Sequence, residues 1–169
     1  MGVRGDFDKL ARLRENLRKL SAAGFKTELS NELGRAGKKL TDDCFRLQRD
    51  PYGDPWKPLS RERARDRRAR LRAERAGRKA KGQRILEDSG RMRGSVNPQP
   101  TATGFRISIP VSYAPVHQYG TKIAGEHHNI VIPQRMMLPT KDRGLPDVWV
   151  TSFNRSASEM LRRKLAVAA

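Results

Sequence analysis

The side chains that could hold a metal or catalyse a reaction are few and scattered along the chain. The three histidines are His117, His127 and His128. Neighbours in an extended segment point to opposite faces, so the last two are poorly placed to share one metal. The acids stand mainly in charged runs such as Asp42-Asp43 and Glu87-Asp88, which helix N-termini and solvated faces explain. With no phosphate-binding glycine loop and no Gly-x-Ser-x-Gly motif, we expect no catalytic residue, no cofactor and no metal site.

The single cysteine, Cys44, cannot form an internal disulfide, so the chain does not resemble a disulfide-stapled secreted domain. It stands among the apolar positions of a predicted helix, which favours a small buried apolar residue over a nucleophile. The first eight residues contain no apolar signal segment, and no run of 18 apolar residues occurs. We therefore expect a protein that is made in the cytoplasm and does not enter a membrane.

Charge is the strongest compositional signal. The chain has 169 residues and a net charge of +18, with 36% hydrophobic and 6% aromatic residues. Such a field attracts polyanions and repels other copies of the same chain unless something neutralises it. Nucleic acid is the favoured partner. An anionic membrane or an acidic protein is the alternative, as is a soluble basic protein with no nucleic-acid role.

Half of this charge lies in residues 61–84, which we call the basic arm. It contains twelve basic and three acidic residues, and Leu71 is its only large apolar side chain. A helix here has no apolar stripe to bury, so we predict an extended or helical arm that orders on a partner. A solvated helix without a partner is the alternative. The candidate contacts to DNA or to a partner are Arg61, Arg63, Arg65, Arg67, Arg68, Arg70, Arg72, Arg75, Arg78, Lys79, Lys81 and Arg84.

The elements that must position the arm begin with two amphipathic helices. Leucines spaced by three and four predict helices over 7–22 and 28–47, joined as a helical hairpin. Gly24 would end the first helix and Thr27 would cap the second. Three prolines exclude a helix from the loop that follows, 50–60.

The second half of the chain predicts a small antiparallel sheet. A short helical or turn segment over 85–92 precedes an extended stretch from Ser95, a turn-rich connection over 97–104, and a strand over 105–109. A third short strand covers 129–132, and a loop covers 139–146. An amphipathic helix starts near Pro146 or Asp147, with its apolar line on Trp149, Phe153, Ala157, Leu161 and Leu165. The prediction is a single α+β domain over 1–169.

Four segments, taken in order, carry a family resemblance. They are 50–59 (Asp-Pro-Tyr-Gly-Asp-Pro-Trp-Lys-Pro-Leu), 85–96 (Ile-Leu-Glu-Asp-Ser-Gly-Arg-Met-Arg-Gly-Ser-Val), 113–121 (Tyr-Ala-Pro-Val-His-Gln-Tyr-Gly-Thr) and 132–139 (Ile-Pro-Gln-Arg-Met-Met-Leu-Pro). Over roughly residues 25 to 165 the chain resembles the phage virion morphogenesis family, which includes tail completion proteins of Mu-like and P2-like phages. It departs from the pattern in its longer basic arm and in Met136-Met137, where an aromatic is expected.

The resemblance implies an α+β subunit that assembles into a ring, commonly six-fold, between the connector and the tail tube. The implied partners are copies of itself, neighbouring connector, tail-terminator or tail-tube proteins, and genomic DNA. The implied location is the neck or proximal end of the tail, after assembly in the host cytoplasm, and no catalytic residue is implied. A free basic nucleic-acid-binding protein is the alternative, and a small enzyme such as a nuclease is a third.

Seven residues of these motifs are candidates for a subunit contact or for holding the fold: Tyr52, Trp56, Tyr113, His117, Gln118, Gly120 and Arg135. The rings of Tyr52 and Trp56 either anchor the loop 50–60 to the body or face a partner. We expect Tyr113 and Tyr119 to pack against the sheet, His117 and Gln118 to bond neighbouring backbone, and Gly120 to permit a turn. Arg135 either crosses to a neighbouring subunit or covers Met136 or Leu138 as a surface arginine.

Overall fold

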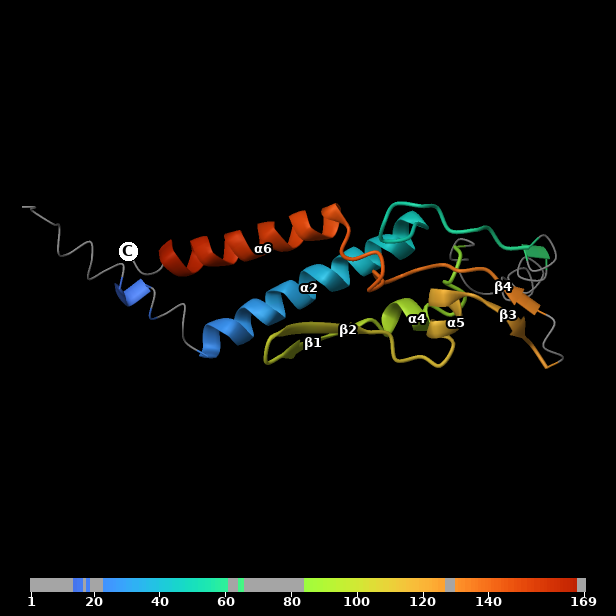
Figure 1. Ribbon diagram of the computed structural model, residues 1–169, viewed down its shortest axis with the longest axis horizontal. Helices are drawn as coiled ribbons and strands as arrows, with labels where there is room; N and C mark the ends of the chain where they lie inside the picture. Colours follow the sequence, from blue (N-terminus) through green and yellow to red (C-terminus); the bar gives the residue numbers. More distant parts are fainter. Residues whose placement is uncertain are drawn as a thin grey trace, which may run out of the picture.

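The computed structural model describes residues 14–16, 18, 23–60, 64, 65, 84–126 and 130–166. Over these residues the chain is α+β, as predicted, with helices and two small antiparallel sheets (Figure 1). The elements are α2 (Ala23–Leu47), α4 (Arg91–Gly94), β1 (Asn97–Thr101), β2 (Gly104–Ser108), α5 (Ala114–Tyr119), β3 (Thr121–Ala124), β4 (Ile130–Ile132) and α6 (Asp147–Ala166).

The long helix α2 begins earlier than the sequence predicts. It starts at Ala23, so the predicted break at Gly24 and the predicted N-cap at Thr27 are wrong. Gly24 has no left-handed φ, and the helix accepts the roughly 1 kcal/mol cost of a glycine because α2 is stabilised by packing against α6 and the β1–β2 hairpin. Residues 14–16 and 18 are helical, as predicted. The rest of the predicted helix over 7–22, and with it the hairpin, lies outside the described residues.

Helix α6 and the β1–β2 hairpin both pack along α2 (Figure 1). Helix α6 runs antiparallel to α2, and Lys164 pairs with Glu28 at the far end of the two helices, at 2.5 Å. Its predicted start near Asp147 is confirmed. The ring of Phe153 meets that of Phe105 from β2, with 5.2 Å between centroids, so all three elements share one apolar seam. Of the helices in the described part, none has the length and apolarity that crossing a bilayer requires.

The first hairpin contradicts the predicted turn over 97–104. Strand β1 carries Pro98 and Pro100 and pairs with β2 through the register Asn97↔Ser108 to Thr101↔Gly104. The prolines alternate, so both direct their missing donor away from β2. A two-stranded sheet has no third strand on that side, and prolines are therefore tolerated there. Only the two residues between Thr101 and Gly104 form the turn.

The sequence predicts one of the two strands of the second sheet. Strand β4 covers most of the predicted strand over 129–132, but its partner β3 was not predicted, and the strands form two separate sheets. Helix α5 was also missed, because six residues are too few to show a periodicity. The segment predicted over 85–92 as a short helix or turn is a turn up to Gly90, where Leu86 and Gly90 have φ of 62° and 74°, and its helical part is confined to α4.

The core lies where α2 ends. Phe45 is fully buried, and its ring meets the edge of Trp56 with 5.5 Å between centroids. Met92, Met137 and Trp149 belong to the same cluster. The predicted burial of Cys44 is confirmed, and burial raises the pKa of its thiol to about 12, with Asp50 and Asp43 adding to the effect. A thiol with this pKa stays protonated at neutral pH and is a poor nucleophile.

Two glycines of α2 allow the β1–β2 hairpin to pack closely against the helix. A Cβ at Gly37 would stand 2.3 Å from Cδ1 of Ile107, and one at Gly34 would stand 3.2 Å from Cβ of Pro98. A helix with side chains at these positions could not approach the hairpin so closely.

We predict that Gly37→Leu lowers the free energy of unfolding by about 2 kcal/mol, because the new side chain overpacks the seam. Denaturant unfolding of the purified chain measures the loss. Gly24→Leu is the matched control, since nothing lies within 4 Å of a Cβ there. Equal stability of the two variants would contradict this account of the seam.

Candidate interaction site at the base of the basic arm

The loop before the basic arm is fixed to the body by the two rings that the sequence singled out. The indole Nε1 of Trp56 donates to the Met136 carbonyl at 2.8 Å, and its ring is buried. The hydroxyl of Tyr52 donates to the Gly144 carbonyl at 2.9 Å and accepts from the Thr140 amide at 3.1 Å. Arg143 lies over the Tyr52 ring, 3.7 Å from its centroid. The predicted anchoring of the loop is confirmed.

Arg135 holds the chain where the arm begins. Its side chain is buried, and it donates to the carbonyls of Lys57 at 2.8 Å and Pro58 at 3.1 Å. Its own amide donates to the His117 carbonyl at 2.7 Å. Burial lowers the pKa of the guanidinium from its ordinary value. The interpretation of Arg135 as a surface arginine is wrong, because the guanidinium is needed inside to satisfy loop carbonyls that no strand or helix pairs.

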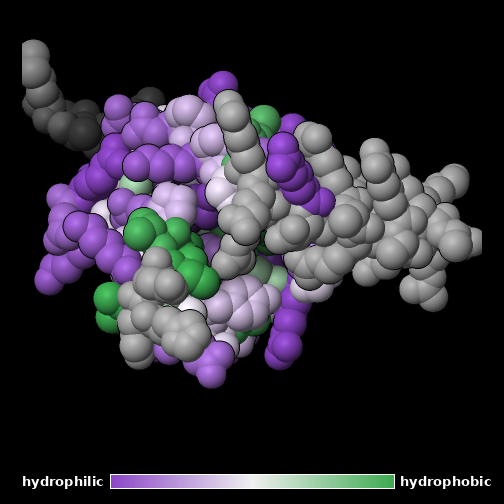
Figure 2. Space-filling model, turned by 90° about the vertical axis from the view of Figure 1, so that its right-hand side faces the viewer, coloured by the Kyte–Doolittle hydropathy of each residue, from purple (hydrophilic) through white to green (hydrophobic). Residues whose placement is uncertain are grey.

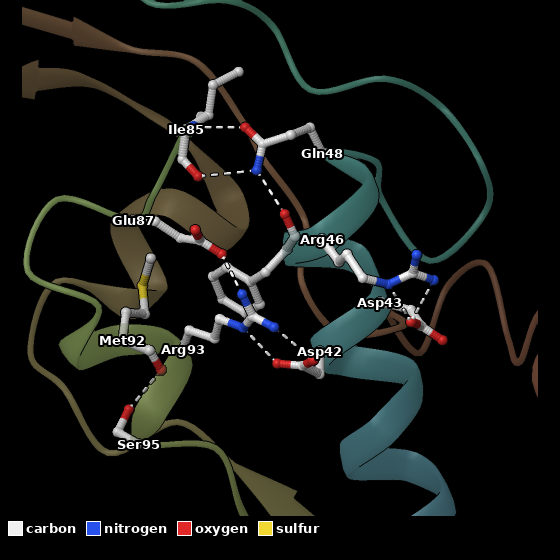
Figure 3. A network of polar contacts seen from close by, with 10 residues as sticks. Asp42, Asp43, Arg46, Gln48, Ile85, Glu87, Met92, Arg93 and Ser95 are labelled. Carbon is white, nitrogen blue, oxygen red and sulfur yellow. Dashed lines mark hydrogen bonds and ion pairs between the residues drawn. The ribbon is translucent and has the colours of Figure 1, made fainter. Parts of the chain in front are cut away.

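Gln48 holds the chain where the arm ends (Figure 3). Its Oε1 accepts from the Ile85 amide at 2.5 Å, and its Nε2 donates to the carbonyls of Phe45 at 2.6 Å and Ile85 at 3.3 Å. One side-chain amide thus pairs with both backbone groups of Ile85, as a neighbouring strand would. Gln48 itself has a φ of 56°, which ends α2 and turns the side chain toward this segment.

A charged network holds the segment that follows. Arg93 donates to Asp42 through Nε at 2.5 Å and Nη2 at 2.7 Å, and through Nη1 to Glu87 at 2.8 Å (Figure 3). The bond from Arg93 lowers the pKa of Asp42 below its ordinary value of 3.8, and the positive charges of Arg46 and Lys38 add to this. The same contacts raise the pKa of Arg93. Two carboxylates from different elements therefore orient one guanidinium and join α4 to α2.

Gln118 of α5 joins the third and fourth motifs. Its Nε2 donates to the Leu138 carbonyl at 2.7 Å, and its Oε1 accepts from the amides of Met137 at 2.9 Å and Leu138 at 3.2 Å. The predicted backbone bonding of this residue is confirmed. Gly120 follows with a φ of 73°, and a Cβ there would stand 2.8 Å from the Gln134 nitrogen. The predicted need for glycine at this turn is therefore also confirmed.

A groove of about 570 Å³ lies between the two fixed ends of the arm. We call it the arm-base groove. Its walls are the loop 57–60, residues of the segment 86–92, the pair Tyr113 and His117, and the strand β4 with Pro133. The lining is mostly apolar. The chain leaves this groove after Ser60 and returns to it after Arg84, so the groove and the arm belong to one site.

The structure places the predicted site residues in three groups. Tyr113, His117 and Arg135 line the groove. Trp56, Gln118 and Gly120 hold the chain behind it, and Tyr52 lies apart, against residues 140–144. The prediction that Tyr119 packs against the sheet is wrong, because this residue is 68% exposed. Tyr113 is 39% exposed and lines the groove.

Of the twelve candidate residues of the arm, Arg65 and Arg84 are described, and both are exposed. The other ten lie outside the described residues, so their contacts stay a prediction. In the described ranges, no three side chains among His, Cys, Asp and Glu come together as a metal site would require. Sequence reasoning missed Gln48, Asp42 and Arg93, which look like ordinary surface residues of a helix or turn. The backbone signal near these residues is the positive φ of Gln48 and of Leu86, and it can be seen only in the structure.

Comparison with known proteins gives one result. Residues 8–148 match the family model described as the phage virion morphogenesis family. The matched range contains α2, the basic arm, both sheets and the groove, and it ends at the start of α6. No curated protein and no solved structure gives a significant match.

We predict that Arg135→Met lowers the free energy of unfolding by about 2 kcal/mol, because two loop carbonyls lose their charged donor. The exposed Arg155→Met is the control and should stay within about 0.5 kcal/mol of the parent. Denaturant unfolding measures both values, and an unchanged Arg135→Met chain would show that solvent replaces this donor at no cost.

A second prediction concerns acid stability. The lowered pKa of Asp42 means that its contribution is fully present above its unfolded value of 3.8 and is lost as the pH falls through the lower folded value. Between about pH 6 and about pH 3, the parent should therefore lose more unfolding free energy than Asp42→Asn, which has no carboxylate to protonate. Parallel losses in the two chains would rule out this carboxylate as an acid-sensitive group.

Proposed function

The chain belongs to the phage virion morphogenesis family, and on that premise we propose that it forms an oligomeric ring at the head–tail neck of a tailed phage. Membership gives it a structural role in virion assembly. The proposal is narrower: the ring completes the head-proximal end of the tail and surrounds the DNA channel. Its partners are other copies of the chain, the adjoining connector, tail-terminator or tail-tube proteins, and the genomic DNA, without a role for a membrane.

The observation that carries the proposal is the way in which the basic arm is attached. Residues 23–60 contain seven basic and six acidic side chains, whereas the basic arm contains twelve basic and three acidic side chains. Both ends of the arm are fixed to one end of a packed body, by Arg135 on one side and Gln48 on the other. In a ring of identical subunits, each body would hold its basic arm at the same distance from the DNA in the central channel.

The contacts expected of such an arm are to phosphates and not to bases. Arginine guanidinium groups make bidentate hydrogen bonds to phosphate oxygens, which gives affinity without sequence preference. Counterion release then makes the binding strongly dependent on salt. We propose no enzymatic step, since the family builds virions and the buried, protonated Cys44 offers no nucleophile.

We predict that replacing Arg67, Arg68 and Arg70 with Gln weakens retention of duplex DNA and lowers the slope of log affinity against log salt by about 3. The matched control replaces Lys141, Arg155 and Arg162, three exposed cations of the body, and should leave that slope unchanged. Filter binding over a series of salt concentrations measures both. Equal slopes for the two triple variants would remove the arm as the DNA contact.

The location is tested separately, in the particle. Antibody labelling of purified phage should place the chain at the junction of head and tail. A chain that is absent from mature particles and binds duplex DNA as a free monomer would instead be a soluble nucleic-acid-binding protein, and the proposed neck ring would be wrong.

A further inference from the structure

Two kinds of surface are exposed on the body. At the β3–β4 end, hydrophobic side chains are uncovered among hydrophilic ones (Figure 2), and Ile123 and Val131 are each 67% exposed. The β1–β2 hairpin exposes backbone groups instead, because each of its strands pairs on one side only in the described part of the chain. Backbone groups have fixed directions and spacing, so they define the conformation of a partner, which an apolar patch does not.

The two outer edges of this hairpin differ in what they offer. Pro98 and Pro100 remove two donors from the outer edge of β1. On β2, the residues opposite these prolines are Ile107 and Phe105, and they direct their amides and carbonyls away from β1. Within the described ranges, none of these four backbone groups makes a hydrogen bond. We call this row of groups the open edge of β2.

The sequence protects one edge of the hairpin and leaves the other accessible. Prolines and charged side chains are two of the devices by which natural sheets prevent unwanted pairing at their edges. Strand β1 carries two prolines and β2 carries none. Arg106 is the one ionisable side chain of the two strands, and it points away from α2, because its neighbours Phe105 and Ile107 pack against that helix. The hairpin therefore resists pairing at β1 and permits it at β2.

A strand added at the open edge would find apolar side chains beneath it. The ring of Phe105 meets that of Phe153 on α6, with 5.2 Å between centroids. Ala157 and Leu161 continue the same line of α6 one and two turns farther on, and both are only half-buried. A strand about 4.8 Å beyond β2 would extend the sheet toward this line, so every second side chain of that strand would face it.

The charge and the apolar line together define the sequence of the partner strand. In antiparallel pairing, the residue opposite Arg106 lies on the outer face, where a carboxylate is favoured. The two residues beside it point the other way, toward α6, and are therefore apolar.

This chain does not supply such a segment. None of its 18 Asp and Glu residues stands between two large apolar residues. Pairing of β2 with β2 of a second copy, centred on Arg106, would also place two guanidinium groups directly opposite each other, which is destabilising. The partner strand therefore comes from a different protein.

We propose that an extended segment of another virion protein pairs with the open edge of β2, and that an Asp or Glu between two apolar residues of that segment lies opposite Arg106. This inference rests on the proposed place of the chain among other virion proteins, and it names the contact that joins them. Backbone hydrogen bonds supply the affinity, while Arg106 and the apolar line of α6 select the segment.

Hydrogen exchange tests this contact in the purified chain and in purified particles. In the free chain, the amides of Phe105 and Ile107 should exchange rapidly, whereas the amide of Arg106, which pairs with β1, should be protected. In particles, we expect the exchange of Phe105 and Ile107 to slow by roughly tenfold or more. Unchanged exchange of these two amides in particles that contain the chain would overturn the pairing.

Two pairs of phage variants separate the backbone donor and the charge from other effects. Ile107→Pro removes the outward donor, while Ile107→Ala shortens the side chain and keeps the donor. Arg106→Glu reverses the charge, and Arg155→Glu makes the same change on an exposed residue of α6. We expect the amounts of Ile107→Pro and Arg106→Glu in particles to be roughly tenfold or more below those of their controls. Equal incorporation of each variant and its control would mean that the edge is not used.

Suppressors of Arg106→Glu identify the partner. We expect second-site changes from Asp or Glu to Lys or Arg in another virion protein, at a position between two apolar residues. Suppressors within this chain would mean that its copies pair with one another, and the proposed partner would be wrong. If the parent chain itself is absent from particles, the proposed function fails as well, so this result differs from a failure of the pairing alone.

Discussion

Hydrogen bonds from buried and half-buried side chains to loop backbone are the interaction on which the arm-bearing half of this protein depends. In its described residues this half has short strands and short helices, so secondary structure satisfies few of their amides and carbonyls. Gln48, Gln118, Trp56 and Arg135 supply the missing partners, each to a segment far away along the chain. Each is also costly to replace, because removing it leaves a polar group without a partner in the interior. The specificity of the fold therefore resides in polar residues as much as in the apolar core.

The parts of the fold that the sequence predicts are those with a repeating pattern or an unusual side chain. Helix α6 follows from a line of apolar residues every four positions, and the anchoring by Trp56 follows from a large ring in an aromatic-poor loop. The sequence predicts the start of α2 too late, because Gly24 and Thr27 are local signals and the packing that extends the helix exists only in the tertiary structure. Strand β1 was missed because its prolines exclude a central strand but not one that is free on one side.

The site was predictable in outline and not in detail. The basic arm and the four motifs are visible in the sequence, and so are Gln118 and Gly120, whose roles depend on local geometry. The partners of Gln48 and Arg93 lie 37 and 51 residues away, and no local pattern reports contacts across such separations. The groove is likewise assembled from four segments with no common sequence feature. The family match explains why the motifs occur together, and the structure explains why each of them is needed.

Fixing both ends of the basic arm beside one groove makes it a closed loop, and a closed loop has a limited reach. A fully extended chain spans at most about 3.5 Å per residue, so the two dozen residues of the arm span roughly 80 Å in total. Since the chain must go out and come back, its tip can lie no farther than about 40 Å from the groove, and a helical conformation shortens this to about half. The arm is therefore a tether of defined length, which sets an upper bound on the gap between this body and any phosphate or protein surface that its arginines contact.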